Sequence, residues 1–295
     1  MIVLELHNNI GMGNQFYLYA YAYALSRREK QEIIIFSRMN EPTRKYVLHL
    51  FNIGNSVTRC YRLDKIQNRV IWKMLSGAGK YLHILFKWRF YYYKESKGDN
   101  RKYQEIPKGL HNYWIAGNFE CHRYFDEYRS DLIKQFQYNG VISDKIKKWI
   151  NIIDKDAASV ALHIRRGDFK RLGRSVPIKF YEDAITYFKS LGGEHTFYLV
   201  TEDMEVVSYF KDCPSVKYIH ALDSENRDIE EWLCLLHCKD HIVTNSTYSW
   251  WAAYLSEKEG KRVITISQSL YEKLENTKGG YEEFYLSEWM PLEER

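Results

Sequence analysis

The sequence lacks any long apolar run. No uninterrupted apolar stretch reaches the roughly 18 residues that a membrane-spanning helix requires. The first five residues, Met1–Glu5, carry no basic segment and include an acid, which is unlike a secretory signal. Cysteine is scarce too. The five cysteines, at positions 60, 121, 213, 234 and 238, are scattered and odd in number, so reduced thiols fit better than a disulfide framework. We therefore expect a cytoplasmic protein.

Internal repeats and low-complexity tracts are missing as well, and the 295 residues have room for two ordinary cores or one large one. The net charge of +5 is modest but unevenly distributed. The segment Arg59–Lys97 holds ten basic residues against two acidic ones, interleaved with aromatic residues. Such a segment suits an anionic membrane surface, and a solvated helical subdomain is an equally good interpretation. No recognition motif accompanies the charge, so nucleic acid is not an expected partner.

The first half of the chain begins with the pattern of an α/β fold. The apolar run Ile2–Leu6 predicts a strand, Gln15–Arg28 a helix and Glu32–Phe36 a second strand. Residues 42 to 108 have a mixed pattern that is mostly helical. The segments Tyr113–Phe119 and Glu127–Phe136 close this half, the second as an amphipathic helix.

The second half alternates short apolar runs with helical patterns. The expected strands are Ala158–Ile164, Thr196–Thr201, Val216–His220, His241–Thr244 and Arg262–Ile266; the expected helices are Ile178–Ser190, Met204–Phe210, Ile229–Cys238 and Ser246–Ser256. This alternation predicts parallel strands joined by right-handed crossovers. We expect two α/β domains, residues 1–154 and 155–295, with a cleft between them. Ligands of such sheets bind beyond the carboxyl ends of the strands.

The strongest candidate site follows the strand Ala158–Ile164. Arg165 and Arg166 can hold a diphosphate through bidentate hydrogen bonds and remain charged at any working pH. Gly167 would allow the backbone to turn close to a ligand. Asp168 could orient an arginine or accept a proton. A surface Arg–Asp pair that caps the strand is the simpler alternative.

A second candidate follows the strand His241–Thr244. Asn245 and Ser246 are good N-cap residues, so a helix is expected to start here, and a helix start binds phosphate through its N–H groups and dipole. The hydroxyls of Ser246, Thr247 and Ser249 add donors. The tryptophans that follow, at 250 and 251, are expected to pack the helix on the sheet.

Two weaker signals complete the candidate nucleotide site. Glu202 and Asp203 follow the strand Thr196–Thr201, where a carboxylate could accept hydrogen bonds from a guanine edge or a ribose, or cap the next helix. Gly13, Asn14 and Gln15 lie in the first strand-to-helix turn. The Gly-x-Gly there lacks the third glycine of the dinucleotide fingerprint, but a close approach of the backbone to a ligand is reasonable.

One cluster imitates a metal site. Cys234, His237, Cys238 and His241 have helical spacing, but no second Cys-x-x-Cys pair exists, and buried thiols are the simpler interpretation. Asp154 and Asp156 match an Asp-x-Asp metal motif, yet they precede their strand and so fall at the wrong end of the sheet. We expect no metal.

These motifs together resemble a known family, the α-1,2-fucosyltransferases of glycosyltransferase family 11. Gly11–Ala20 is similar to the family's opening Gly-Leu-Gly-Asn-Gln motif, and His163–Asp168 to its His-x-Arg-Arg-Gly-Asp motif. Asp240–Ala253 resembles its Asn-Ser-x-x-Ser-Trp-Trp motif, and aromatic pairs at 113–114 and 124–125 resemble its middle segment. The chain departs from the family in lacking a glycine at positions 8 and 9 and in carrying Thr201 before Glu202.

The resemblance implies a GT-B-like fold, in which two Rossmann-like domains face a central cleft, with the acceptor on the side of residues 1–154 and GDP-fucose bound by residues 155–295. It implies inverting, metal-independent transfer of fucose from GDP-β-L-fucose to the 2-hydroxyl of a terminal β-galactose, as in O-antigen or capsule biosynthesis. In this interpretation Arg165 stabilises the leaving phosphate, and Asp168, or secondly His163, removes the acceptor proton. Fucosyl transfer of another regiochemistry, and a non-catalytic nucleotide-sugar or glycan-binding protein, are the alternatives.

Overall fold

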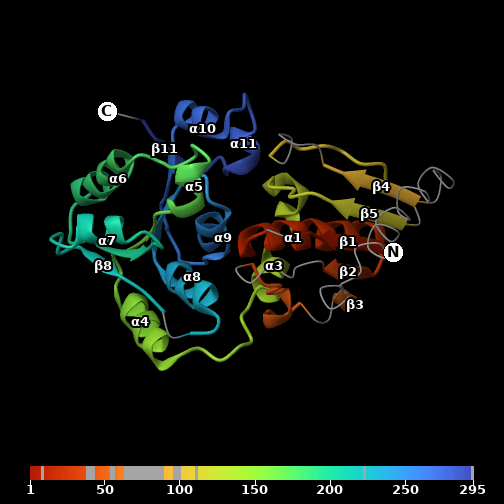
Figure 1. Cartoon of the computed structure of the whole chain (residues 1–295), viewed down its shortest axis with the longest axis horizontal. Helices are drawn as coiled ribbons and strands as arrows, with labels where there is room; N and C mark the ends of the chain where they lie inside the picture. Colours follow the sequence, from red (N-terminus) through yellow and green to blue (C-terminus); the bar gives the residue numbers. More distant parts are fainter. Residues whose placement is uncertain are drawn as a thin grey trace. The chain divides into compact units, whose positions relative to one another are not determined.

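The computed structural model describes residues 1–7, 10–37, 44–53, 57–62, 90–95, 101–109, 112–221 and 224–293. It divides the chain into two compact units, Met1–Gly140 and Val141–Arg295, each built around its own parallel sheet (Figure 1). From the sequence, the boundary between the domains was expected at residue 154. It lies earlier because helix α4 (Asp144–Lys155) packs on helix α8 (Arg227–His237) of the second unit.

The first unit holds a five-stranded sheet with the strand order β3-β2-β1-β5-β4, and every neighbouring pair is parallel. The strands are β1 (Ile2–Leu6), β2 (Ile33–Ser37), β3 (Val57–Arg62), β4 (Phe90–Lys94) and β5 (Asn112–Ala116). The helices are α1 (Met12–Glu29) and α3 (Arg129–Gln135), with short 3-10 turns η1 (Leu48–Leu50), η3 (His122–Tyr124) and η4 (Asp126–Tyr128). Strands β1 and β2 and helix α1 were expected from the sequence.

Helix α1 is buried on almost every side because its sequence is rich in aromatic residues and alanine. The ring of Phe16 stacks on that of Phe136, with centroids 4.1 Å apart. Two tyrosine hydroxyls of α1 have polar partners. Tyr19 donates to Gln135 at 2.7 Å, and Tyr23 donates to Asp131 at 2.9 Å. A helix that is apolar all round must be enclosed in this way. This packing anchors the start of α1, which carries Asn14.

The prediction of a mostly helical segment between residues 42 and 108 was wrong for two parts of it. Val57–Arg62 and Phe90–Lys94 are strands β3 and β4 at the two edges of the sheet. The run of tyrosines at 91–93 favours a strand, because aromatic residues pack well on a pleated surface. Residues 63–89, which hold most of the basic and aromatic segment Arg59–Lys97, lie outside the described residues.

The second unit holds a six-stranded parallel sheet with the order β11-β10-β9-β6-β7-β8. Its strands are β6 (Ser159–His163), β7 (Thr196–Val200), β8 (Val216–Tyr218), β9 (Asp240–Val243), β10 (Val263–Ile266) and β11 (Met290–Leu292). Its helices, besides α4 and α8, are α5 (Gly167–Arg171), α6 (Ile178–Ser190), α7 (Met204–Phe210), α9 (Thr247–Leu255), α10 (Gln268–Glu275) and α11 (Tyr281–Phe284). The alternation predicted from the sequence is confirmed, and α6 and α7 have the predicted bounds.

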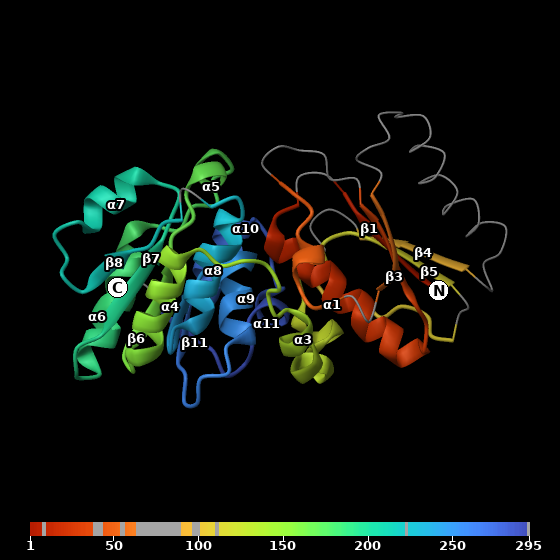
Figure 2. The same cartoon turned by 90° about the horizontal axis from the view of Figure 1, so that it is seen from below.

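The helices of the second unit cover both faces of its sheet. Helices α6 and α7 lie on one face and α4, α8 and α9 on the other, as the two views in Figures 1 and 2 show. Right-handed crossovers require this change of face, because the chain first builds the sheet from β6 towards β8 and then from β9 towards β11. The strand order thus reverses between β6 and β9.

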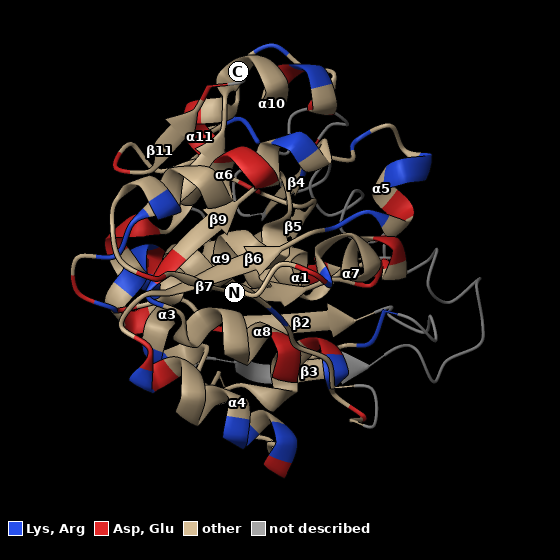
Figure 3. Ribbon diagram, turned by 90° about the vertical axis from the view of Figure 1, so that its left-hand side faces the viewer, with Lys and Arg blue, Asp and Glu red and all other residues tan. Residues whose placement is uncertain are grey.

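The middle strands of this sheet are buried on both faces, so they consist of apolar runs. Figure 3 shows β6 and β7 without charged residues, whereas helices α4 and α5 carry both signs of charge. Trp250 and Trp251 are fully buried, and the Trp250 indole donates to the carbonyl of Phe284 at 2.5 Å. Both tryptophans are thus core residues, as expected, and the ring of Trp250 also lies against those of Phe284 and Trp289. Within the described ranges, no helix combines the length and apolarity needed to cross a membrane.

Candidate functional site

The reversal of strand order in the second unit brings its two strongest motifs together. Strands β6 and β9 are hydrogen-bonded neighbours, with Leu162 opposite Ile242. Both strands run in the same direction, so the residues after His163 and after Val243 leave the sheet at the same edge. In open α/β sheets this edge, at the switch in strand order, is where ligands bind. Arg165 and Asn245, far apart in sequence, are thus placed beside one binding region.

Asp168 orients Arg165. The Arg165 guanidinium donates through Nε to Oδ1 of Asp168 at 3.0 Å and through Nη2 to Oδ2 at 2.8 Å. Its central carbon lies 4.9 Å from the ring centroid of Phe169. One edge of the guanidinium is therefore fixed, and the side chain keeps 22% of its surface exposed. Of the two roles considered for Asp168, the structure shows the orienting one; removal of a proton by the same carboxylate remains a prediction.

Arg166 faces a different set of groups. Its Nε lies 3.6 Å from Oδ2 of Asp203, and the ammonium of Lys170 contacts the same carboxylate at 2.8 Å. The hydrogen bond from Lys170 lowers the pKa of Asp203. Asp203 also caps α7 by accepting from the N–H of Glu205 at 2.9 Å. This capping role was the alternative considered for Asp203.

Gly167 leaves space for a protein side chain. Glu202 accepts a hydrogen bond from the Gly167 N–H at 3.0 Å, and a Cβ at position 167 would lie 2.9 Å from the Glu202 Oε1 atom. The space beside Gly167 is thus occupied by Glu202, whereas a ligand was expected there from the sequence. Glu202 in turn ties the β6 loop to the end of β7.

His163 is buried at the carboxyl end of β6, with its ring 4.8 Å from that of Tyr248. Burial, reinforced by the positive charge of Arg165, lowers the pKa of His163 to about 3. The imidazole is therefore neutral at any ordinary pH. Protonating it would place a cation in a buried position beside another cation, which makes His163 the less suitable of the two candidate bases.

The turn from β9 into α9 has the expected form, with Ser246 as the N-cap residue and Thr247 as the first residue of the helix. The first N–H groups of a helix have no acceptor within the helix, so this start can serve an anion. Two predicted donors have protein partners. The buried Ser249 hydroxyl donates to the Ser246 carbonyl at 3.2 Å, and the Asn245 amide donates to the Arg174 carbonyl at 3.1 Å.

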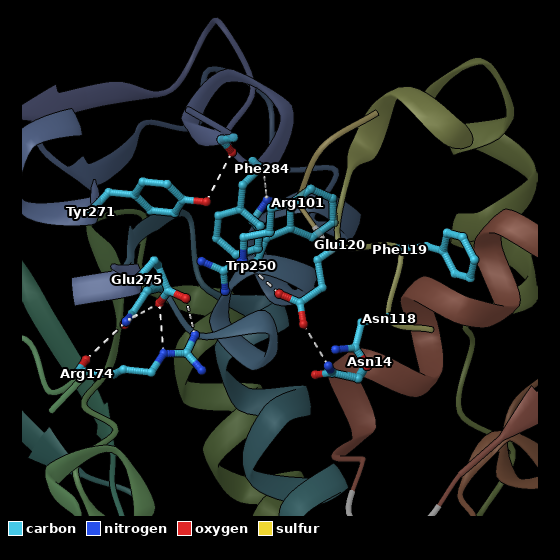
Figure 4. Close-up of polar contacts among 12 residues, drawn as sticks. Asn14, Arg101, Asn118, Phe119, Glu120, Arg174, Trp250, Tyr271, Glu275 and Phe284 are labelled. Atoms are coloured by element: carbon cyan, nitrogen blue, oxygen red, sulfur yellow. Dashed lines mark hydrogen bonds and ion pairs between the residues drawn. The ribbon is translucent and has the colours of Figure 1, made fainter. Parts of the chain in front are cut away.

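The Asn245 amide also reaches Glu275, a residue that the sequence analysis missed together with Arg174. Nδ2 of Asn245 donates to Oε1 of Glu275 at 2.8 Å. The same carboxylate binds Arg174 through two contacts, from Nε to Oε1 at 3.1 Å and from Nη2 to Oε2 (Figure 4). Nothing local in the sequence marks these residues, since Glu275 ends helix α10 about a hundred positions after Arg174.

The first unit has its own reversal of strand order, between β1 and β5. Near these strands, Asn14, Arg101 and Glu120, which follow β1, β4 and β5 respectively, form a largely buried polar group that Figure 4 shows in sticks. Asn14 donates through Nδ2 to Oε1 of Glu120 at 2.8 Å, and Arg101 donates through Nε to Oε2 at 2.7 Å. The side chains of Arg101 and Glu120 are only 7% and 6% exposed. Neither residue was singled out from the sequence.

The other two candidates in this turn are enclosed by the protein. Gly13 is buried in the first turn of α1. Gln15 is also buried, and its amide bridges two backbone groups: it donates to the Lys45 carbonyl at 2.9 Å and accepts from the Val47 N–H at 3.0 Å. Of the three predicted residues, Asn14 alone is partly exposed, so it is the one best placed to reach a ligand.

The loop after β5 is held in an unusual conformation. Phe119 has a φ of 51°, a left-handed value that is uncommon for a bulky residue. Glu95 holds it there, because Oε2 accepts from the N–H groups of Asn118 at 2.7 Å and Phe119 at 3.0 Å. Such strain costs about 1–3 kcal/mol and clusters at binding sites. Figure 4 shows that Asn118 and Phe119 directly precede Glu120 in this loop.

The side chains of the cysteine and histidine cluster do not converge on one point in the described structure. Among the residues that the structure describes, no three His, Cys, Asp or Glu side chains come together as a ligand set. Cys234 and Cys238 are buried, which raises the pKa of Cys234 to about 12, so both remain thiols. His237 instead contacts Asp154 at 3.0 Å. The interpretation as buried thiols is confirmed.

Solved structures with the same fold are fucosyltransferases of the GT-B type. The NodZ fucosyltransferase from Bradyrhizobium aligns with a TM-score of 0.51 and 14% identity, over 91% of this chain and 94% of that one. A FUT1 variant from Arabidopsis thaliana, solved with GDP, aligns with a TM-score of 0.53 and 8% identity, over 90% and 70%. The α/β fold of GT-B-type glycosyltransferases is thereby confirmed.

Comparison of the sequence identifies the family to which the chain belongs. The model of glycosyl transferase family 11 matches residues 6–293, and the chain belongs to that family. An Escherichia coli O-antigen biosynthesis glycosyltransferase, WbnK, is 26% identical over 86% of this chain and 91% of its own length. An Escherichia coli alpha-1,2-colitosyltransferase is 27% identical over 83% and 84%, and the galactoside alpha-(1,2)-fucosyltransferase 2 of Pongo pygmaeus 20% identical over 84% and 68%.

The buried pair of Arg101 and Glu120 predicts a large effect of one substitution. Glu120→Gln removes the negative charge that contacts the buried Arg101 guanidinium at 2.7 Å, so we expect the first unit to lose about 3–5 kcal/mol of unfolding free energy. The matched control is Glu127→Gln, because Glu127 pairs with Arg28 at the surface and should contribute less than about 1 kcal/mol. Urea unfolding measures both. Equal, small losses for the two variants would contradict a buried, charge-paired Glu120.

Proposed function

We propose that this chain transfers L-fucose from GDP-β-L-fucose to the 2-hydroxyl of a terminal β-galactose, with inversion to an α-1,2-fucoside. Membership of family 11 supports glycosyl transfer, and two relatives named as alpha-1,2-transferases support the linkage. A NodZ structure soaked with GDP-fucose supports the donor. The observation that carries the proposal is Arg165, a guanidinium oriented by a bidentate carboxylate at the switch in strand order.

The reaction is a single displacement. A bond forms between the acceptor oxygen and the anomeric carbon of fucose while the bond from that carbon to the β-phosphate oxygen breaks. The electron pair of the breaking bond goes to the phosphate, and the acceptor loses its proton. Negative charge therefore grows on the β-phosphate in the transition state. Arg165, assisted by Arg166 and the start of α9, is placed to stabilise it.

Asp168 is the first candidate to take the acceptor proton. Its side chain is 30% exposed, whereas His163 is buried and has a pKa of about 3. Asp168 also accepts two hydrogen bonds from Arg165, and a carboxylate is in general a weak base. A weak base is adequate where the leaving group departs early, because the acceptor hydroxyl becomes acidic only as its bond to the sugar forms.

The donor sugar has one specific alternative. The relative named alpha-1,2-colitosyltransferase is more similar to this chain than the relative named as a fucosyltransferase, 27% against 20% identity. Colitosyl transfer to the same hydroxyl is thus the second candidate. Parallel assays with the two donors discriminate between them, and a protein that binds a donor yet turns over with no acceptor would be a binding protein only.

Product analysis tests the proposed function. The protein is incubated with GDP-fucose and a panel of glycans that end in β-galactose, and the linkage of each product is determined by NMR. We expect an α-1,2-fucosyl galactose. A product fucosylated at another hydroxyl would replace the proposed regiochemistry with one of the alternatives.

The leaving phosphate is proposed to be stabilised by protein cations, so the reaction should proceed unimpaired in EDTA. Initial rates with excess EDTA, compared with rates after adding Mg²⁺ or Mn²⁺, provide the measurement. A loss of most activity that either cation restores would show that a metal ion carries this charge.

Arg165 should matter more in the transition state than in the resting donor complex. We expect Arg165→Ala to lower kcat by about 10²- to 10³-fold. Arg165→Lys keeps the charge but loses the planar fork, so it should also be severely impaired. Arg171→Ala is the matched control, because Arg171 is an exposed arginine at the end of α5, the helix that follows the Arg165 loop. A folded Arg165→Ala variant that keeps more than about a tenth of the activity would remove Arg165 from this role.

We also propose that the basic and aromatic segment Arg59–Lys97 contacts an anionic membrane surface peripherally. The protein should then co-sediment with vesicles that contain phosphatidylserine but not with phosphatidylcholine vesicles, and high salt should weaken the association. Equal sedimentation with both kinds of vesicle, or with neither, would speak for an ordinary solvated segment.

A further inference from the structure

A second guanidinium at the switch in strand order repeats the arrangement of Arg165. Arg174 is held by Glu275 through Nε and Nη2, just as Arg165 is held by Asp168 through the same two atoms. In the part of the chain that the structure describes, no hydrogen bond involves Nη1 of either arginine. Both side chains are partly exposed, 22% for Arg165 and 31% for Arg174. Each guanidinium thus has one fixed edge and one that can receive a ligand.

The two guanidiniums share one aromatic neighbour. The central carbon of each lies 4.9 Å from the ring centroid of Phe169, so the two carbons are separated by no more than twice that distance. Phe169 is buried, and its ring provides a rigid surface beside both cations. Stacking of this kind fixes the plane of a guanidinium at little entropic cost. Arg165 and Arg174 are therefore a preorganised pair, although nine positions separate them in sequence.

Arg166, the other arginine of the Arg-Arg motif, lacks these features. It contacts Asp203 only through Nε at 3.6 Å, and Lys170 contacts the same carboxylate more closely. No bidentate carboxylate orients Arg166 within the described residues. Arg174 is thus the better partner for Arg165 in binding an anion with several oxygens.

The carboxylate that holds Arg174 also reaches the second motif. Glu275 accepts a hydrogen bond from Asn245 at 2.8 Å, and Asn245 donates in addition to the Arg174 backbone carbonyl at 3.1 Å. Arg174 is therefore fixed to the residue that directly precedes Ser246, the N-cap of α9. An ordinary surface ion pair would not be fixed by hydrogen bonds such as these two from Asn245.

We propose that Arg174 is a second diphosphate-binding guanidinium of the donor site and that Glu275 is its positioning residue. The proposal rests on the proposed function, because the diphosphate is that of the nucleotide-sugar donor. Arg165 and Arg174 each donate to the diphosphate through the edge that the carboxylate leaves open. Neither Arg174 nor Glu275 lies in the motifs that carry the family resemblance.

Binding measurements with three ligands test the role of Arg174. Calorimetry compares GDP, inorganic pyrophosphate and guanosine for the wild type, for Arg174→Gln, and for the control Arg171→Gln, which removes the same charge from an exposed position. We expect Arg174→Gln to weaken GDP and pyrophosphate by roughly 10- to 100-fold, as for the loss of a hydrogen bond to a charged group. Guanosine, which has no phosphate, should bind unchanged, and Arg171→Gln should resemble the wild type.

A double variant separates a direct contact from a change in local charge. Arg174→Gln alone leaves Glu275 without its cation, and that negative charge could itself repel a phosphate. Arg174→Gln combined with Glu275→Gln removes both charges, so it should fold even if the single variant does not. We expect the double variant to bind pyrophosphate as weakly as Arg174→Gln. Recovery to within about threefold of the wild-type affinity, well short of the loss expected for a direct contact, would overturn the proposal.

The outcomes for this proposal and for the proposed function are distinguishable. If the wild type binds GDP and Arg174→Gln binds it equally well, only the role of Arg174 fails. If the wild type binds pyrophosphate but not GDP, the proposed donor fails, and the pyrophosphate comparison still decides the role of Arg174. If the wild type binds neither ligand, both are overturned.

Discussion

In each unit the strand order of a parallel sheet reverses at one place, and this reversal determines where polar side chains can stand. Strands β6, β7 and β9 are covered on both faces, so the sheet itself admits few charged residues. Where the order reverses, the loops that follow the two neighbouring strands lead to opposite faces of the sheet. These loops diverge and leave a space at the carboxyl ends of the strands. The polar groups of the candidate site gather there. The fold of each unit thus fixes the location of its site before any side chain is considered.

Within that location, carboxylates determine the direction in which the cations point. Arg165 and Arg174 are each held by a bidentate carboxylate. The carboxylate of Asp203 forms an ion pair with Lys170 and a longer one with Arg166. The positive charges are largely balanced by protein acids. Affinity for an anion must then come from the fixed direction of individual N–H groups more than from an excess of positive charge. Substitutions of the carboxylates should therefore act through the arginines that they hold.

The sequence predicted strands β6 to β10 and helices α6 to α9 of the second unit, because their apolar runs have clear periods, but it did not single out α4, α10, α11 or β11. Helices α6 and α7 were found with their observed bounds. It failed where tertiary context decides: α5 has five residues, too few for a period, and the edge strands β3 and β4 were read as helical. Motifs identified Arg165 and Asn245, because their residues are contiguous. Glu275 and Glu120 escaped notice, since each acts on a partner brought close only by the fold.

The contact between Asn245 and Glu275 has a consequence for the order in which the chain becomes functional. Arg165, Asn245 and Glu275 are made far apart in time on the ribosome, and Phe284, which accepts from the Trp250 indole, comes later still. Domains fold as units once their residues have emerged. The first unit can fold early, but Arg174 stays unoriented until α10 has emerged and docked. A nascent chain would thus hold a complete first unit well before the Arg174 guanidinium is oriented by Glu275.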